Sequence, residues 1–233
     1  MVPLGARLSL AGRGAGALIH AMVQTKICGV KTPDAVAAAL EGGAAFIGFN
    51  MFPASPRYVS PEDAGRLAPP IRGRARIAAV TVDPDDALLD RLMASLRPDL
   101  IQLHGRETPT RAAAIAARTG VDVIKALPVA EASDVDAAAP FDAAVAHLMF
   151  DAKAPAGAPI PGGNGVAFDW TMLAGRRFSR PWFLAGGLDP WNVGDAISGS
   201  GAPMVDVSSG VERGPGIKDP ALISAFLEAV RRS

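Results

Sequence analysis

Residues 25–49 read TKICGVKTPDAVAAALEGGAAFIGF and contain one complete strand–helix–strand unit. The β-branched and apolar run Thr25–Cys28 predicts a strand, and Ala45–Phe49 predicts the next one. Between them, Thr32 is a suitable N-cap and Pro33 occupies the first helical position. Two strands joined by a helix pair in parallel, because the helix returns the chain to the same end of the sheet.

Outward from this unit, short apolar runs alternate with amphipathic segments to the C-terminus. Ser60-Pro61 and Asp189-Pro190 have the residues of further helix starts. Apolar residues at three- and four-residue spacing predict helices over Asp85–Leu96, Thr108–Ala117 and Pro220–Arg231. The expected strands are Thr25–Cys28, Ala45–Phe49, Ile77–Val82, Leu100–Leu103, Val121–Ala126, Ala146–Phe150, Trp182–Ala185 and Met204–Val207.

This alternation favours one architecture over others. Strands separated by helices imply crossover connections and therefore a parallel sheet. Eight such units in about 210 residues match the lower end of the size range of a (β/α)8 barrel, roughly 200 to 400 residues. An open doubly wound sheet is the alternative, although it has no need of an eighth strand. Because no linker-like tract divides residues 22–233, we expect a single (β/α)8 TIM barrel with its active site at the C-terminal face of the strands.

The composition is that of a globular protein without a strongly charged partner. The 233 residues include 23 basic and 23 acidic side chains, so neither nucleic acid nor a membrane is expected as a partner. The longest apolar runs are far shorter than the ~18 residues of a membrane span. A single cysteine excludes an intrachain disulfide, and with only three histidines it argues against a zinc site. These features predict a cytoplasmic protein that uses no metal and no other cofactor.

The first 21 residues differ from the rest of the chain. They include Arg7 and Arg13 but no acidic residue, and glycines and arginines interrupt the apolar centre that a secretory signal needs. An organelle transit peptide is one interpretation. A translation start at Met22, or a disordered tail, is the preferred one. Residues 1–21 are therefore treated as an N-terminal extension, and residues 22–233 as the catalytic barrel.

In such a barrel the reactive groups lie where the strands end, at the C-terminal face. Cys28 ends the first strand, and Lys26 projects to the same side because strand side chains alternate. A neighbouring ammonium favours a thiolate, whereas a lone cysteine is more often a small buried hydrophobe. Asp151 ends the sixth strand and is a candidate proton donor, a helix cap or an ion-pair partner of Lys153.

Small residues follow the last two strands, where the phosphate sites of barrel enzymes commonly lie. Gly186 and Gly187 come after the seventh strand, and Ser209 and Gly210 after the eighth. They predict a phosphate site, with ordinary tight turns as the alternative. Arg57, after the second strand, is either a second anion contact suited to a carboxylate or a solvated surface arginine.

Three further polar residues on the strands are expected to face the barrel interior. His104 is either a ligand contact or a satisfied core histidine. Asp206 is a stronger candidate for a ligand contact, because an unpaired charge in a barrel mouth is costly. Lys125 is expected to neutralise buried carboxylates or to have a purely structural role.

Six strand ends carry a set of segments, namely Lys26–Val30, Gly48–Val59, Ile101–Gly105, Phe150–Pro155, Leu184–Leu188 and Val205–Glu212. The fourth of these is followed by Pro161–Gly165 and Phe168–Trp170, and the last by Pro215–Asp219. Together and in this order they resemble the phosphoribosylanthranilate isomerases of tryptophan biosynthesis, over about residues 22–230. The sequence departs from the family pattern at Thr81–Asp83 and in the extended loop 156–165, where Asn164 replaces a common Thr. Neither departure is expected to touch the acid or the base.

The resemblance implies an Amadori rearrangement of N-(5-phospho-β-D-ribosyl)anthranilate to 1-(2-carboxyphenylamino)-1-deoxy-D-ribulose 5-phosphate. It also implies that Cys28 is the general base, Asp151 the general acid, Arg57 the contact for the anthranilate carboxylate, and Asp206 a substrate-positioning group. A monomer or a homodimer is expected. Two rivals are a histidine-pathway aminoaldose isomerase, which would normally use two aspartates, and a non-catalytic phosphosugar-binding barrel, which has no reason to keep both an acid and a base.

Overall fold

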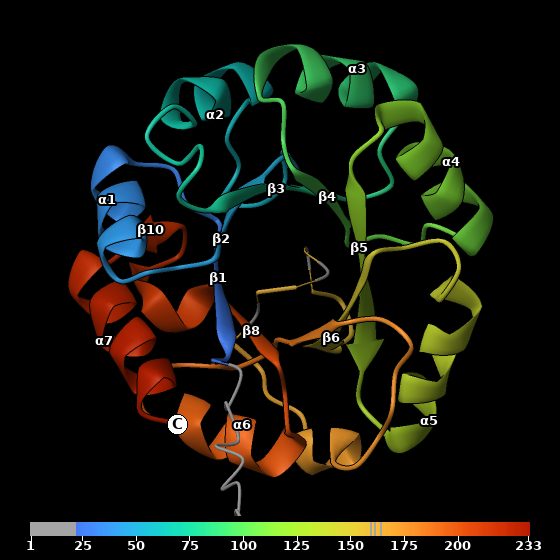
Figure 1. Cartoon of the computed structure of the whole chain (residues 1–233), viewed down its shortest axis with the longest axis vertical. Helices are drawn as coiled ribbons and strands as arrows, with labels where there is room; N and C mark the ends of the chain where they lie inside the picture. Colours follow the sequence, from blue (N-terminus) through green and yellow to red (C-terminus); the bar gives the residue numbers. More distant parts are fainter. Residues whose placement is uncertain (1–21, 159, 161, 164) are drawn as a thin grey trace, which may run out of the picture.

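Eight parallel strands form a closed barrel in the computed structural model, which describes residues 22–158, 160, 162, 163 and 165–233. Each strand pairs with its neighbours in sequence, and β8 closes the barrel by pairing with β1 (Figure 1). The expected barrel is therefore confirmed, and the open sheet is excluded. The strands are β1 Gln24–Cys28, β2 Phe46–Asn50, β3 Arg76–Thr81, β4 Leu100–Leu103, β5 Asp122–Val129, β6 His147–Ala152, β7 Trp182–Leu184 and β8 Met204–Val207.

Helices surround the barrel and follow one another around its outside (Figure 1). Several begin as the sequence predicts, because Thr32, Ser60, Asp85, Thr108 and Asp219 accept hydrogen bonds from backbone N–H groups of the first helical turn. The helical segments are α1 Pro33–Glu41, α2 Pro61–Leu67, α3 Asp86–Ser95, α4 Pro109–Thr119, α5 Ala132–Val135, η1 Asp136–Phe141, η2 Trp170–Leu173, α6 Val193–Ser200, η3 Ser209–Val211 and α7 Pro220–Arg231. After β8 a short hairpin, β9 Glu212–Gly214 and β10 Ile217–Lys218, precedes α7.

Most strand ends lie within one or two residues of the prediction, and two boundaries differ by more. The helix start expected at Asp189-Pro190 is wrong, because the Asp189 carboxylate accepts from the N–H groups of Trp191 and Asn192 and forms a turn. The helix begins only afterwards, at Val193. Strand β5 continues beyond the expected end, through Pro128 to Val129, because its pairing with β6 extends that far.

The barrel interior changes character along the strands. One part is filled by a cluster of apolar side chains, Phe46, Ala78, Leu100, Ile124, Ala126, Met149, Phe183, Ala185 and Met204. Nearer the C-terminal ends, buried polar side chains replace them, among them Lys26, Gln102, Asp151 and Asp206. Burying polar groups costs free energy unless they are paired. Their presence at the C-terminal ends of the strands therefore indicates that the functional site lies there. Among the described residues, no helix is both long and apolar enough to cross a membrane.

Candidate active site

A pocket opens at the C-terminal ends of the strands and contains nearly all the residues selected from the sequence. Within the described part of the chain it is lined from the ends of every strand except β5. It contains about 760 Å³ of space outside the protein atoms, and this volume includes open solvent. Its lining includes Cys28, Arg57, His104, Asp151, Gly186, Gly187, Asp206 and Ser209.

Cys28 ends β1 at the floor of this pocket and is 7% exposed. The ammonium of Lys26, two residues earlier, is fully buried and donates to Asp206 Oδ1 at 2.8 Å. Asp206 is therefore paired, not the unpaired charge that the sequence suggested. Gly29 follows Cys28 with φ +75°, and a Cβ there would lie 2.7 Å from Arg57 Cδ. The first strand thus ends in a turn that only glycine accommodates beside Arg57.

Opposing effects act on the two titratable groups of β1. Burial raises the pKa of the Cys28 thiol, and the positive charges of Lys26 and Lys218 act against this rise. Burial alone would lower the pKa of the Lys26 ammonium, but its charge interactions and hydrogen bonds with Asp206 and Cys28 together outweigh burial and leave that pKa raised. Lys26 is thus held protonated beside the thiol, where it favours the thiolate once a proton has left.

Asp151, near the end of β6, lies across the pocket mouth from the cysteine strand and is 7% exposed. Its Oδ1 accepts from the N–H of Ala152 at 2.9 Å, and its Oδ2 lies 3.1 Å from His104 Nε2. His104 Nδ1 lies 3.1 Å from Gln102 Nε2. With Gln102 donating to Nδ1, a neutral imidazole carries its proton on Nε2, facing Asp151. His104 is therefore a polar partner of Asp151 at the pocket wall.

The loop after β6 passes close to Asp151 at Gly162, a residue that is not one of the departures from the family pattern. A Cβ on Gly162 would lie 2.6 Å from His104 Nε2 and 2.7 Å from Asp151 Oδ2. Only glycine lets the backbone pass this close to the pair. Pro159, Pro161 and Asn164 of this loop lie outside the described residues. Lys153 is exposed, so the alternative of an Asp151–Lys153 ion pair is wrong.

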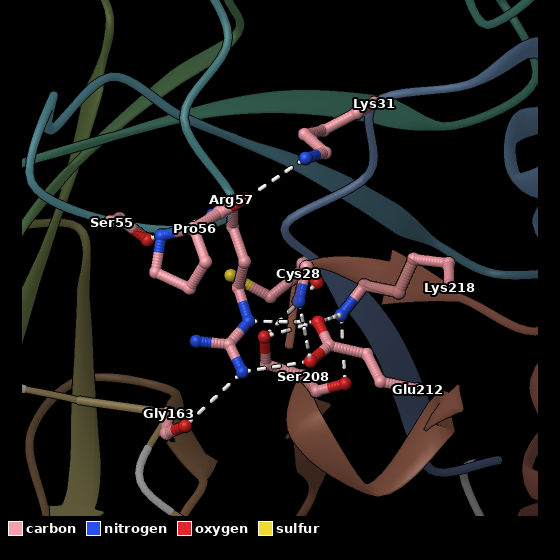
Figure 2. Close-up of polar contacts among 10 residues, drawn as sticks. Cys28, Lys31, Ser55, Pro56, Arg57, Gly163, Ser208, Glu212 and Lys218 are labelled. Carbon is pink, nitrogen blue, oxygen red and sulfur yellow. Dashed lines mark hydrogen bonds and ion pairs between the residues drawn. The ribbon is translucent and has the colours of Figure 1, made fainter. Parts of the chain in front are cut away.

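Arg57 is buried, at 5% exposed, so the interpretation as a solvated surface arginine is wrong. Its Nε donates to Glu212 Oε1 at 2.8 Å, and its Nη2 donates to Glu212 Oε2 at 2.9 Å and to the Gly163 carbonyl at 3.2 Å. Lys218 donates to the same carboxylate from its other side (Figure 2). Sequence reasoning gave no role to Glu212 or Lys218, although both lie in the segments that carry the resemblance.

The glycines after β7 adopt left-handed conformations, with φ +86° at Gly186 and +67° at Gly187. A Cβ on Gly186 would meet the Ala152 nitrogen at 2.5 Å. The N–H groups of both glycines donate to no described residue, which leaves them available to an anion. Gly210 does not line the pocket. A Cβ there would lie 2.0 Å from the Leu188 carbonyl oxygen, so this glycine lets the loops after β7 and β8 approach each other.

Lys125 lies on the opposite face of its strand from the one expected. Its neighbours Ile124 and Ala126 belong to the interior cluster, so Lys125 points outward between barrel and helices. There it donates to Glu107 at 2.6 Å and to the Gly105 carbonyl at 2.8 Å. Its role is structural, since this pair ties β5 to the loop that carries His104. Among the described residues, no three His, Cys, Asp or Glu side chains are grouped as metal ligands.

A closed parallel barrel whose C-terminal mouth holds a thiol, a carboxylate and a buried arginine defines a (β/α)8-barrel enzyme suited to acid–base chemistry. Comparisons with known proteins agree. Residues 25–229 match the family described as N-(5′-phosphoribosyl)anthranilate (PRA) isomerase. The chain belongs to the N-(5′-phosphoribosyl)anthranilate isomerase family.

Individual relatives cover most of the chain. It is 66% identical over 209 residues to the N-(5′-phosphoribosyl)anthranilate isomerase of Caulobacter vibrioides, an alignment that spans 89% of this chain and 95% of the relative. The solved phosphoribosyl anthranilate isomerase of Thermotoga maritima superposes with a TM-score of 0.81 at 33% identity, covering 91% of this chain and all of that one. A similar structure (TM-score 0.79, 31% identity, the same coverage) holds reduced 1-(o-carboxyphenylamino)-1-deoxyribulose 5-phosphate.

The chain therefore acts on a small-molecule substrate. It converts N-(5-phospho-β-D-ribosyl)anthranilate to 1-(2-carboxyphenylamino)-1-deoxy-D-ribulose 5-phosphate, an aldose–ketose isomerisation of tryptophan biosynthesis. The two rivals raised by the sequence, a histidine-pathway isomerase and a non-catalytic barrel, are set aside by this family membership.

Proposed function

We propose that Cys28 is the general base of this isomerisation and Asp151 its general acid. The observation that carries the proposal is their placement: both line one pocket, from strands β1 and β6, with Lys26 beside the thiol and His104 beside the carboxyl group. Lys26 supplies positive charge beside the thiol, and His104 holds the Asp151 carboxyl group toward the pocket.

Two proton transfers that involve Asp151 and Cys28 precede a final tautomerisation. Asp151 donates its proton to the furanose ring oxygen as the C1–O bond breaks, and the nitrogen lone pair forms the C1=N bond of a Schiff base. Cys28, as the thiolate, then takes the proton from C2. The electrons of that C–H bond form a C1=C2 double bond, and the C=N pair returns to nitrogen. The resulting enol tautomerises to the ketone by gaining a proton at C1 and losing one from its hydroxyl. Each positioned transfer typically contributes ~10²–10⁴-fold to the rate.

Other pocket residues bind the two anionic ends of the substrate. Gly186, Gly187 and Ser209, with Gly210 behind them, form the phosphate site after β7 and β8. Arg57 binds the anthranilate carboxylate. Asp206 and His104 position the sugar between these two anchors. Asp206 is itself held by Lys26, and His104 is held by Asp151.

The direct test of the function is an assay that follows anthranilate fluorescence as the purified chain consumes freshly generated phosphoribosylanthranilate. Rapid consumption that depends on the chain is expected. Failure to turn this substrate over would contradict the assignment.

Replacing Gly187 by valine tests the phosphate site. The added side chain would meet Ala167, whose Cβ lies 2.7 Å from a Cβ on Gly187, and would displace the loop that offers N–H groups to the phosphate. Since a hydrogen bond to a charged group contributes ~1.5–3 kcal/mol, we expect the KM and the inhibition constant of inorganic phosphate to rise about tenfold or more. Steady-state kinetics with phosphate as competitive inhibitor measure both.

Gly43→Val is the matched control, because Gly43 also has a left-handed φ, +78°, but a Cβ there meets nothing within 4 Å. Gly43→Val introduces the same kind of backbone strain as Gly187→Val but displaces no loop. The KM of the Gly43→Val variant should therefore stay near the wild-type value. Unchanged phosphate inhibition in folded Gly187→Val would move the site elsewhere.

We also propose that residues 22–233 are the complete catalytic unit. The described residues close the barrel through pairing of β1 with β8, which begins at Gln24. A chain that begins at Met22 should therefore keep its kcat and its melting temperature. A large drop in either quantity on removal of residues 1–21 would show that this segment contributes to the barrel. A cytoplasmic location and a monomeric or homodimeric state complete the proposal.

A further inference from the structure

Three buried charges meet at the edge of the pocket, on Arg57, Glu212 and Lys218. Their side chains are 6%, 4% and 2% exposed. Glu212 accepts from Arg57 at 2.8 and 2.9 Å and from Lys218 at 2.7 Å, so one carboxylate serves two cations (Figure 2). Burying charges is expensive, and such a group is retained only where its members are well paired. The reaction assigned above uses Arg57 alone.

The paired state of Arg57 poses a problem for its proposed role. The Glu212 carboxylate already occupies Nε and Nη2 of the guanidinium, and one negative charge cancels its positive charge. An arginine neutralised in this way has little net attraction for a second carboxylate. The substrate's carboxylate would instead meet the like charge of Glu212, and in a buried site that repulsion is only weakly screened.

Lys218 supplies the missing charge. Its Nζ donates to the Ser208 carbonyl at 2.7 Å, to Ser208 Oγ at 3.3 Å and to Glu212 Oε1 at 2.7 Å. These three acceptors match the three N–H donors of an ammonium. Burial lowers the pKa of Lys218, and the Glu212 carboxylate opposes that effect. With Lys218 protonated, the three side chains together carry one net positive charge.

The hairpin that carries Lys218 also holds the Arg57 loop in place. Gly216, at the hairpin turn, donates to Glu212 Oε2 at 3.1 Å. A Cβ on Gly216 would lie 2.3 Å from the Pro56 carbonyl oxygen, so the hairpin backbone rests directly on the residue before Arg57. Lys31 donates to the same Pro56 carbonyl at 2.9 Å. The charges and the backbone of the hairpin therefore act on Arg57 together.

We propose that Lys218 is a positioning residue that keeps Arg57 electrostatically able to bind the substrate's carboxylate, by neutralising the Glu212 that orients Arg57. Glu212 fixes the guanidinium through Nε and Nη2, and Nη1, which donates to no described residue, is the nitrogen that would meet the ligand. Lys218 then determines specificity for a carboxylated over an uncarboxylated aminosugar phosphate without touching either. The proposal rests on the proposed role of Arg57.

The test compares two ligands by equilibrium titration. One is reduced 1-(o-carboxyphenylamino)-1-deoxyribulose 5-phosphate, and the other is the same molecule without its carboxylate. Lys218→Met should weaken binding of the carboxylated ligand about tenfold or more, equivalent to ~1.4 kcal/mol, while changing the affinity for the other ligand little. Binding is measured instead of turnover because Lys218 also acts electrostatically on the Cys28 thiol.

The double variant Lys218→Met/Glu212→Gln restores one net positive charge and removes both members of a buried pair. The preference of the double variant for the carboxylated ligand should return to near the wild-type value. If Lys218→Met acted only by removing packing contacts of the lysine side chain, the second substitution would not restore the preference. The double variant also serves if the single variant fails to fold. The proposal would be overturned if folded Lys218→Met kept the wild-type preference for the carboxylated ligand. It would also be overturned if the double variant had a preference as low as that expected of Lys218→Met alone.

Arg57→Met separates this inference from the assignment on which it rests. If Arg57→Met leaves the preference for the carboxylated ligand intact, the role of Arg57 itself is wrong and the Lys218 inference is overturned with it. If Arg57→Met abolishes the preference and Lys218→Met keeps it, only the inference about Lys218 is wrong.

Discussion

Cys28→Ser should lower turnover by orders of magnitude while product-analogue binding stays within about tenfold, which is 1.4 kcal/mol. Serine keeps the size of the side chain but replaces a thiol of ordinary pKa ~8.5 with a hydroxyl that hardly ionises at neutral pH. The groups assigned to the phosphate and the carboxylate are untouched. A loss of turnover without a matching loss of binding is the signature of a group that acts in the transition state. Fluorescence-monitored kinetics and titration with the reduced product analogue measure the two quantities.

The pH profile provides a second measurement on the same variant. Because burial raises the pKa of the Cys28 thiol, the thiolate fraction grows as pH increases above neutrality. The rate at which a thiol alkylating agent modifies the wild-type chain should rise over that range, and Cys28→Ser should not be modified. Alkylation reports the thiolate alone, whereas kcat/KM also requires the proton on Asp151. A merely structural cysteine behaves differently, since its serine variant would lose stability through a buried hydroxyl yet keep the turnover of the folded enzyme.

Asp151→Asn should lower turnover to a similar degree, because the amide keeps the shape of the side chain but has no acidic proton to give to the ring oxygen. His104 can still donate to the amide oxygen from its position 3.1 Å away, so the pocket wall should stay in place. Product-analogue binding should therefore remain near wild type. The same kinetics and titration apply to this variant.

Asp86→Asn is a suitable control for the removal of one carboxylate. Asp86 is exposed on α3, where it pairs with Arg111 and Arg118 at the surface, and such exposed pairs contribute little to stability. Its variant should turn over at the wild-type rate. Near wild-type turnover by folded Asp151→Asn would instead remove Asp151 from the role of acid.

The barrel could be predicted from the sequence because parallel strands are buried on both faces and appear as short apolar runs. Strands β4 and β8 have the bounds expected from Leu100–Leu103 and Met204–Val207. The helix starts at Thr32 and Ser60 could also be predicted, because an N-cap residue followed by proline is a local signal. The start at Asp189 failed because the same residue type also forms a tight turn.

The face of the strand from which a side chain projects was harder to predict from the sequence. Lys125 was expected inside the barrel, but a polar residue within an apolar run does not reveal which face of its strand it occupies, and the structure places it outside. Pairings between distant segments are equally invisible in one sequence. Arg57 and Glu212 are 155 positions apart, and only the closed barrel brings them to 2.8 Å. The same holds for His104 and Asp151, whose contact joins β4 and β6.

The order of the two proton transfers can be tested most directly with substrate that carries deuterium at C2. In single turnovers, Cys28→Ser should convert the deuterated substrate more slowly than the ordinary one, because breaking the C2–H bond limits its rate. Asp151→Asn should convert both substrates at the same rate, because ring opening limits it and leaves that bond intact. The absence of an isotope effect in Cys28→Ser, or a full effect in Asp151→Asn, would contradict the assignment of Cys28 as base and Asp151 as acid.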